Sequence, residues 1–326
     1  MIRRLLGRFP SQDQNKIVDD WVVTIDQPMI WLNQMARCGG TLTLRLFDGH
    51  PEVHVHPRPM PIRWPLRVNN KNSEKIFEHF SLQKYHLLGW QKVASNQFQT
   101  VVPIYFNQNW YSSIFQSFET KTARELIDAA CTARFNAWRN YQSLYGEKKY
   151  QLLHTTIWSQ LNVERIYNNF FELYPDGYSL YILRKPEDWV ASLSNLDESN
   201  RPKTLNKIDE YLSEYISILT LYSNIAKQQN SGRMILLEFD DFIIDSTSNL
   251  KAICNRVGIC YNSSFEATTT NGLLLQANSS HVKSEKGGPD PSVIGKGAAL
   301  RKEMKNSSLF SEASALFRRA RDQSIG

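Results

Sequence analysis

A glycine-rich turn stands between an apolar run and a helical segment, and its residue types suit the binding of a phosphate group. Its residues are Ala36, Arg37, Cys38, Gly39, Gly40, Thr41 and Leu42. A tight turn at the start of a helix points several backbone N–H groups into one space, where the helix dipole also favours an anion. Glycine lets the backbone approach that anion closely, and Arg37 adds a permanent charge. The sequence therefore predicts an anion site at residues 36–42, although an ordinary turn with a solvated Arg37 fits the loop alone equally well.

A second candidate contact for an anion follows a later apolar run. Arg184 comes directly after the predicted strand 179–183, and Ser192 lies in the helix predicted from Pro186. An arginine at the carboxyl end of a parallel strand can donate two hydrogen bonds to a phosphate. Ligands of parallel sheets bind at that edge, and Ser192 can face the same pocket. An arginine paired with a nearby acid, followed by an ordinary helical serine, is the alternative interpretation of this segment.

The elements that must position these residues alternate between strands and helices. Apolar runs predict strands at 29–35, 53–56, 150–154, 179–183 and 233–239, with a further short strand at 21–25. Helix signals predict helices at 41–47, 121–145, 162–174, 186–195, 205–228, 248–257 and 309–321. This alternation favours a three-layer α/β fold with a central parallel sheet of about five strands. Residues 66–118 show little periodicity, and 268–297 are expected to form a long loop.

The composition is that of a folded chain with a mild preference for anions. The 326 residues are 41% hydrophobic and 12% aromatic, which allows a large core. The net charge of +6 is not gathered into a dense Lys/Arg block, so we expect no nucleic-acid partner. Cys38, Cys131, Cys254 and Cys260 match no zinc spacing and are expected to be free thiols. We expect one domain over residues 1–326, with 1–28 as a lead-in.

No apolar run reaches the length of a signal peptide core or a membrane span. We therefore expect a soluble protein without a transmembrane segment and with a cytoplasmic location. No cluster of metal-ligating residues is evident, so no metal is expected. The oligomeric state cannot be inferred from the sequence.

Both candidate segments resemble the sulfotransferase family. That family has a Pro-Arg/Lys-Ser-Gly-Thr-Thr loop after its first strand, and many bacterial and tyrosylprotein-type members then have a helix that ends in Asp-x-His-Pro-x-Val. This chain has Ala36-Arg37-Cys38-Gly39-Gly40-Thr41, followed by Asp48-Gly49-His50-Pro51-Glu52-Val53. The segment Arg184-Lys185-Pro186-Glu187-Asp188, with Ser192 downstream, is similar to the family's Arg-Asp-Pro-x-Asp segment and its later serine. Ala36, Cys38 and Gly40 depart from the family pattern.

The resemblance spans about residues 29–300 and implies a P-loop-like fold. It also implies an enzyme that uses 3'-phosphoadenosine-5'-phosphosulfate (PAPS) as donor, releases adenosine 3',5'-bisphosphate (PAP) and requires no metal. The implied donor-binding residues are Arg37, Cys38, Gly39, Gly40, Thr41 and Leu42 in the loop, with Arg184 and Ser192 on the 3'-phosphate. Residues 268–300 resemble the loop that covers the nucleotide. There Lys296 and Arg301 could reach a phosphate, but a solvated basic loop fits them at least as well.

Transfer of a sulfuryl group would require charge stabilisation and a general base. Arg37 would stabilise the charge that grows on the leaving phosphate. The acceptor would be a hydroxyl or amine of a glycan, lipid or small molecule, in a pocket shaped by residues 57–65 and 66–118. His154 is the first candidate base because it ends the predicted strand 150–154, His56 is the second, and Glu52 is a distant third. A structural role at a strand end fits each histidine about as well.

Two other functions remain open at this point. A P-loop-type small-molecule kinase is disfavoured because G-x-x-x-x-G-K-[ST] is absent and no lysine follows the second glycine. A non-catalytic nucleotide-binding protein with a decayed site is the other alternative. The departures at Cys38 and Gly40 and the unassigned base are compatible with it.

Overall fold

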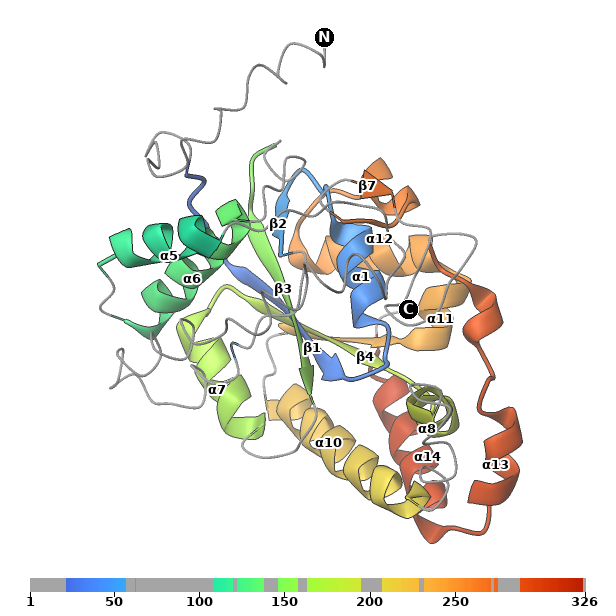
Figure 1. Cartoon of the computed structure of the whole chain (residues 1–326). Coiled ribbons are helices and arrows are strands. Elements are labelled where there is room, and N and C mark those ends of the chain that lie inside the picture. Colours follow the sequence, from blue (N-terminus) through green and yellow to red (C-terminus); the bar gives the residue numbers. More distant parts are fainter. Residues whose placement is uncertain are drawn as a thin grey trace.

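A five-stranded parallel sheet forms the centre of the computed structural model (Figure 1). The structure describes residues 22–56, 62, 108–119, 122–137, 146–157, 163–194, 207–228, 232–270, 273–274 and 288–324. The strand order is β2-β3-β1-β4-β5, and every pair in this sheet is parallel. The strands are β1 (Met29–Met35), β2 (Val53–Val55), β3 (Tyr150–Ile157), β4 (Tyr178–Leu183) and β5 (Met234–Glu238). The expected α/β fold with about five parallel strands is confirmed.

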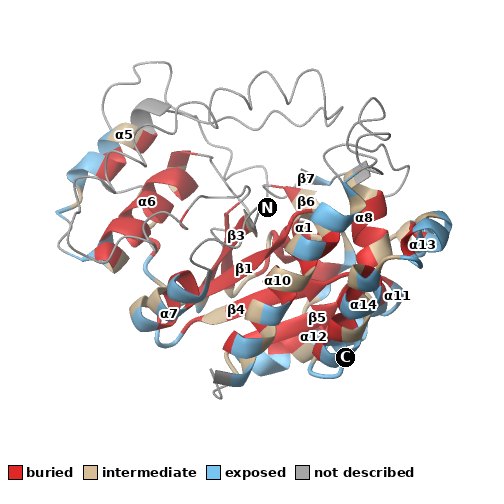
Figure 2. Cartoon of the chain, turned by 90° about the horizontal axis from the view of Figure 1, so that it is seen from below, coloured by how far each residue is buried: buried red, intermediate tan, exposed pale blue. Residues whose placement is uncertain are grey.

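Helices cover both faces of the sheet and complete the three layers (Figures 1 and 2). One face carries α1 (Gly40–Phe47) and α12 (Ser246–Val257), and the other carries α6 (Ala123–Ala137), α7 (Val163–Leu173) and α10 (Ile208–Gln228). The remaining helices are α5 (Gln108–Ser117), α8 (Pro186–Ser194), α11 (Phe239–Ile244), α13 (Ala298–Met304) and α14 (Ser308–Arg321). Short elements near the C-terminus are η5 (Ser263–Glu266), η6 (Pro291–Val293) and the antiparallel pair β6 (Thr269–Thr270) and β7 (Leu273–Leu274).

The apolar character of β1 follows from its central place in the sheet. All seven of its residues are buried, because helices cover both of its faces (Figure 2). Trp31 packs against Tyr167 and Phe170 of α7, with ring centroids 5.0 and 4.8 Å apart. Its indole nitrogen donates a hydrogen bond of 2.7 Å to the Thr155 hydroxyl on β3. The strand that leads into the glycine turn is therefore fixed by packing and by polar contacts.

The strand expected at 21–25 is absent from its described part, residues 22–25. Side chains of α6 take the place of a neighbouring strand there. The Val23 N–H donates to Asn136 Oδ1 at 2.9 Å, and Asn136 Nδ2 donates to the Val23 carbonyl at 2.9 Å. The hydroxyl of Thr132, one helical turn earlier, makes the equivalent pair of bonds with Ile25. The prediction of a strand here was therefore wrong, because these backbone groups pair with side chains of α6.

Several predicted bounds shift for identifiable reasons. β3 continues to Ile157 because it pairs with the whole of β1, so His154 lies within the strand and not at its end. β5 ends at Glu238, whose carboxylate accepts a hydrogen bond of 2.9 Å from the Asp241 N–H and caps α11. Helices α5, α11 and α13 lie where none was predicted, and the expected loop 268–297 contains β6, β7 and η6. Residues 138–145 of the predicted helix 121–145 lie outside the described residues.

None of the helices in the described ranges has the length and apolar character that crossing a bilayer requires.

Candidate active site

The glycine turn joins the end of β1 to the start of α1 through two left-handed residues. Arg37 has a φ of 69°, and Gly39, the N-cap of α1, has a φ of 90°. A Cβ at Gly39 would lie 2.7 Å from the ring of Phe239, so both the backbone angle and the space require glycine. The first N–H groups of a helix have no partner within it and are available to a ligand. The turn therefore has the backbone geometry of an anion site.

The segment after β4 lies against this turn. Arg184 Nη1 donates a hydrogen bond of 2.6 Å to the Arg37 carbonyl, and Arg37 Nε donates one of 3.1 Å to the Ser192 hydroxyl. Trp189 Nε1 donates to the Ala36 carbonyl at 2.8 Å. Because β1 and β4 are neighbours in the sheet, their carboxyl ends bring these residues together. The two segments singled out in the sequence thus meet at one edge of the sheet.

The electrostatics of this edge favour a negatively charged ligand. Arg184 is only 6% exposed, and its guanidinium lies 4.5 Å above the ring of Phe239. Burial lowers the pKa of both arginines, and the charge of Arg184 lowers that of Arg37 further. Holding two cations close together in a partly buried place costs free energy. An anion between them would offset that cost.

Cys38 has a fully buried side chain within the turn. The thiol is buried and donates a weak hydrogen bond of 3.8 Å to the Ala36 carbonyl. Burial raises its pKa to about 12 against the opposing effect of Arg184 and Arg37, so the thiol is protonated at neutral pH. Leu42 is also buried, so contacts from either position to an anion would come from the backbone. None of the four cysteines, all of which lie in the described part of the chain, forms a disulfide.

His154 lies beside the turn, on the face of the sheet that carries α1. Its imidazole is 3% exposed, and neither ring nitrogen has a hydrogen-bond partner among the described residues. Its Nε2 lies 2.6 Å from the position that a Cβ on Gly40 would occupy. Burial lowers the pKa of His154 to about 4, so the ring is neutral at pH 7.

Comparison with solved structures assigns this arrangement to a known fold. The structure aligns with the sulfotransferase domain from the Synechococcus PCC 7002 olefin synthase with a TM-score of 0.59 and 13% identity, over 90% of this chain and 95% of that one. The chain has the sulfotransferase fold. A sulfotransferase from Alicyclobacillus acidocaldarius aligns over 92% of this chain and 97% of that one, with a TM-score of 0.46 and 13% identity. No protein-family model matches the chain, and no curated protein is significantly similar to it in sequence.

Within this sulfotransferase fold, His56 lies on the opposite face of the sheet from His154. It follows β2, is completely buried, and packs edge-on against Phe135 of α6. Its Nε2 lies 3.4 Å from Oε1 of Gln151, and burial lowers its pKa to about 3. The structure therefore does not bring the two candidate histidines together. Glu52 forms an ion pair with Lys149 and accepts a hydrogen bond from the Cys260 N–H.

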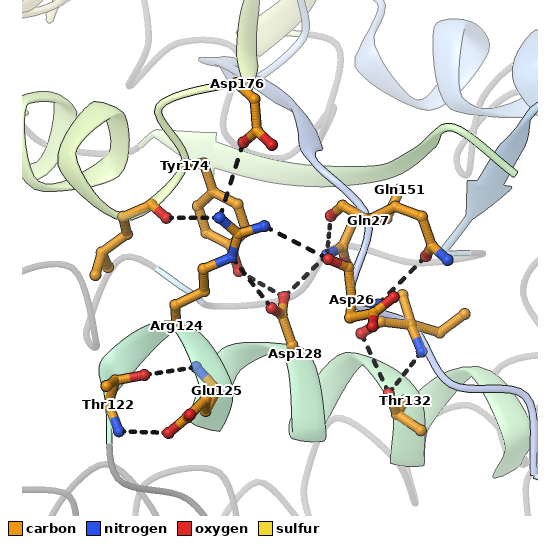
Figure 3. Close-up of polar contacts among 12 residues, drawn as sticks. Asp26, Gln27, Thr122, Arg124, Glu125, Asp128, Thr132, Gln151, Tyr174 and Asp176 are labelled. Carbon is orange, nitrogen blue, oxygen red and sulfur yellow. Dashed lines mark hydrogen bonds and ion pairs between the residues drawn. The ribbon is translucent and has the colours of Figure 1, made fainter.

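Gln151 connects His56 to a polar network around Asp128. Figure 3 shows the contacts of Asp128 and Gln151 within this network. Asp128 Oδ1 accepts hydrogen bonds from Gln151 Nε2 at 3.0 Å and from the Tyr174 hydroxyl at 2.8 Å, and Oδ2 pairs with Arg124 at 3.5 Å. Gln151 lies at the amino end of β3. Its Nε2 also donates a hydrogen bond to the carbonyl of Gln27, just before β1. This network therefore ties α6 to the sheet edge opposite the glycine turn.

The segment 48–53 that resembles sulfotransferases has an architectural role. His50 Nε2 hydrogen-bonds the Cys260 carbonyl at 2.9 Å, while the Thr269 hydroxyl donates to Asp48 Oδ2 at 2.6 Å. Lys148 Nζ donates to the carbonyl of His50 at 2.8 Å. These contacts fasten the segment after α1 to the chain that follows α12 and to the residues just before β3.

The loop around Lys296 is anchored to the first turn of α8. Asp188 Oδ1 accepts from the Gly297 N–H at 2.6 Å, and Oδ2 accepts from the Gly295 N–H at 3.3 Å. Lys296 is exposed, and Arg301, also exposed, pairs with Glu187 at 3.8 Å. The sequence identified this loop by resemblance but does not show that Asp188 anchors it. The one feature of the sequence that could have indicated this anchor is the position of Asp188 as the final acid of the Arg184–Asp188 segment.

Proposed function

We propose that this chain is a sulfotransferase that moves a sulfuryl group from PAPS to a hydroxyl or amine of an acceptor. The observation that carries the proposal is the convergence of the glycine turn with Arg184 and Ser192, within a sulfotransferase fold. One anionic end of a nucleotide can lie on the turn, while a second anionic end lies on the segment after β4. This two-ended arrangement suits a donor with separate 3'- and 5'-phosphates.

The residues of the chain suit this donor. The turn would hold the 5'-phosphate and the sulfate, because the left-handed Gly39 starts α1 there and the first N–H groups of a helix are available to an anion. Arg184 and Ser192 would bind the 3'-phosphate. The loop fastened by Asp188 would cover the nucleotide and bring Lys296 and Arg301 near it. The proposed donor-binding residues remain Arg37, Cys38, Gly39, Gly40, Thr41, Leu42, Arg184, Ser192, Lys296 and Arg301.

The chemistry asked of the chain is stabilisation of charge and removal of one proton. The acceptor oxygen or nitrogen forms a bond to sulfur while the bond from sulfur to the 5'-phosphate oxygen breaks, and that oxygen keeps the electron pair. Arg37 stabilises the growing charge and, since it stays protonated, cannot act as an acid. His154 is our first candidate to accept the proton, because it is neutral and unpartnered beside the turn in the described part of the chain. His56 is the second, although it would have to act from the other face of the sheet.

The acceptor class, a glycan, lipid or small molecule, stays a prediction, as do the cytoplasmic location and the single-domain organisation. We expect residues 57–65 and 66–118 to shape the acceptor pocket, and of these the structure describes only residues 62 and 108–118.

The test is calorimetry followed by a transfer assay. We expect PAP to bind without magnesium, and radioactive sulfur to move from PAPS to at least one member of a panel of hydroxyl and amine acceptors. Nucleotide binding that requires magnesium, with phosphate transfer from ATP, would support the kinase alternative and contradict the proposal. PAP binding with an inert panel would instead favour the non-catalytic alternative.

A further inference from the structure

Two buried polar side chains lie side by side at the start of α1. Gln34 of β1 is 2% exposed and His154 of β3 is 3% exposed. Leu32 lies opposite His154 in the register, so Gln34, two residues after Leu32, points to the same face of the sheet. Among the described residues, Gln34 Oε1 and both ring nitrogens of His154 have no hydrogen-bond partner. Buried polar groups are normally paired, so these two side chains indicate a polar ligand.

The amide of Gln34 occupies the space that a side chain at position 40 would need. A Cβ on Gly40 would lie 1.9 Å from Gln34 Nε2, 2.7 Å from Gln34 Cδ and 2.6 Å from His154 Nε2. None of these distances is compatible with a side chain larger than that of glycine. Gly40 and Gln34 therefore form a matched pair, in which the strand supplies a polar side chain to a place that the helix leaves open.

The strand order indicates which part of the donor this amide would meet. β1 has β4 on one side and β3 on the other. Arg184 and Ser192 come from the β4 side, whereas Gln34 meets His154 on the β3 side. A nucleotide with its 3'-phosphate on Arg184 would direct its other anionic end, which carries the transferable group, toward His154. An amide N–H suits a sulfuryl oxygen because it donates a hydrogen bond and carries no charge of its own.

We propose that the Gln34 amide, which fills the space that a side chain at position 40 would need, donates a hydrogen bond from Nε2 to an oxygen of the transferable sulfuryl group. Gln34 is then a donor-binding residue that distinguishes PAPS, which carries the sulfuryl group, from PAP, which lacks it. The inference rests on the proposed function.

The first test replaces Gln34 with methionine, which keeps the length of the side chain and removes its N–H group. We expect the affinity for PAPS to fall about tenfold while the affinity for PAP stays as in the wild type. Equal losses for both nucleotides, or no loss for either, would overturn the role of Gln34. If the wild-type chain binds neither nucleotide, the proposed function itself fails, which separates the two results.

The second test exchanges the matched pair. Gly40→Thr alone is expected to lose stability, because its Cβ collides with Gln34 and His154. Gln34→Gly alone is expected to fold and to lose the preference for PAPS over PAP. The double variant Gln34→Gly/Gly40→Thr removes the collision with Gln34, and only the His154 ring, whose Nε2 lies 2.6 Å from the new Cβ, still has to shift. It places a hydroxyl donor in the same space, so part of the preference should return. A double variant that melts like the wild type but prefers PAPS no more than Gln34→Gly would contradict the proposal.

Discussion

Replacing Arg184 by alanine tests the second anchor of the nucleotide most sharply. The guanidinium has two structural contacts, a hydrogen bond of 2.6 Å to the Arg37 carbonyl and a stack at 4.5 Å over Phe239. Loss of a hydrogen bond from a charged donor to the 3'-phosphate should cost about 1.5–3 kcal/mol, or roughly ten- to hundredfold in the dissociation constant of PAP. Arg184→Lys keeps the charge but cannot donate two hydrogen bonds to one phosphate from a planar group, so its affinity for PAP should lie between those of the wild type and Arg184→Ala.

The assay is calorimetry with two ligands, PAP and AMP, because AMP has no 3'-phosphate. The affinity for AMP should change much less than that for PAP. Arg233→Ala is a matched control: Arg233 also stacks on an aromatic ring, Phe171, at 4.5 Å and donates to backbone carbonyls, but it lies at the start of β5. It should bind PAP normally. Equal losses for PAP and AMP in Arg184→Ala would mean that Arg184 only shapes the turn, and unchanged PAP affinity would remove it from the site.

Three further predictions concern charge, proton transfer and pH. Arg37→Ala should lower turnover by about a hundredfold or more, as for a lost transition-state donor, and near-normal turnover in a sulfur-transfer assay would show that Arg37 is not involved. His154→Ala should abolish most activity while PAP affinity is retained, and normal rates would move the search to His56. In the wild type, the acid limb of the turnover profile should then lie near pH 4, where the neutral ring is lost. For Asp128, burial raises the pKa from 3.8 to about 6, so the folded state retains a proton that the unfolded chain releases. Its contribution to stability is complete below pH 3.8 and is lost as the pH rises through about 6. Denaturant unfolding at a series of pH values should show this decline in the wild type and not in Asp128→Asn, and an identical decline in both would contradict the assignment.

The parts of the site that are contiguous in the chain could be predicted from the sequence. The apolar run, the glycines and the following helix lie within residues 29–47, so the strand, turn and helix of the anion site follow from local pattern alone. The carboxyl end of β4 could also be predicted from local sequence, because Pro186 marks the start of α8 shortly after Arg184. The fact that both ends lie at the same edge follows from parallel pairing, which the alternation of strands and helices predicted.

Features that depend on contacts between distant segments could not be read from the sequence. His154 was placed at the end of a strand because nothing local shows that β3 pairs with β1 as far as Ile157. In the sequence, Gln34 is only part of an apolar run, since its contact with the space beside Gly40 depends on side-chain packing across the turn. The pairing of residues 22–25 with Thr132 and Asn136 has the same origin, because those partners lie more than a hundred residues away.

A crystal structure of the chain with PAP tests the central claim most directly. We predict that the 5'-phosphate accepts hydrogen bonds from the backbone of the glycine turn, and that the 3'-phosphate lies within hydrogen-bond reach of Arg184 and Ser192. A nucleotide bound at another surface, or one that leaves either of these two segments untouched, would contradict the account.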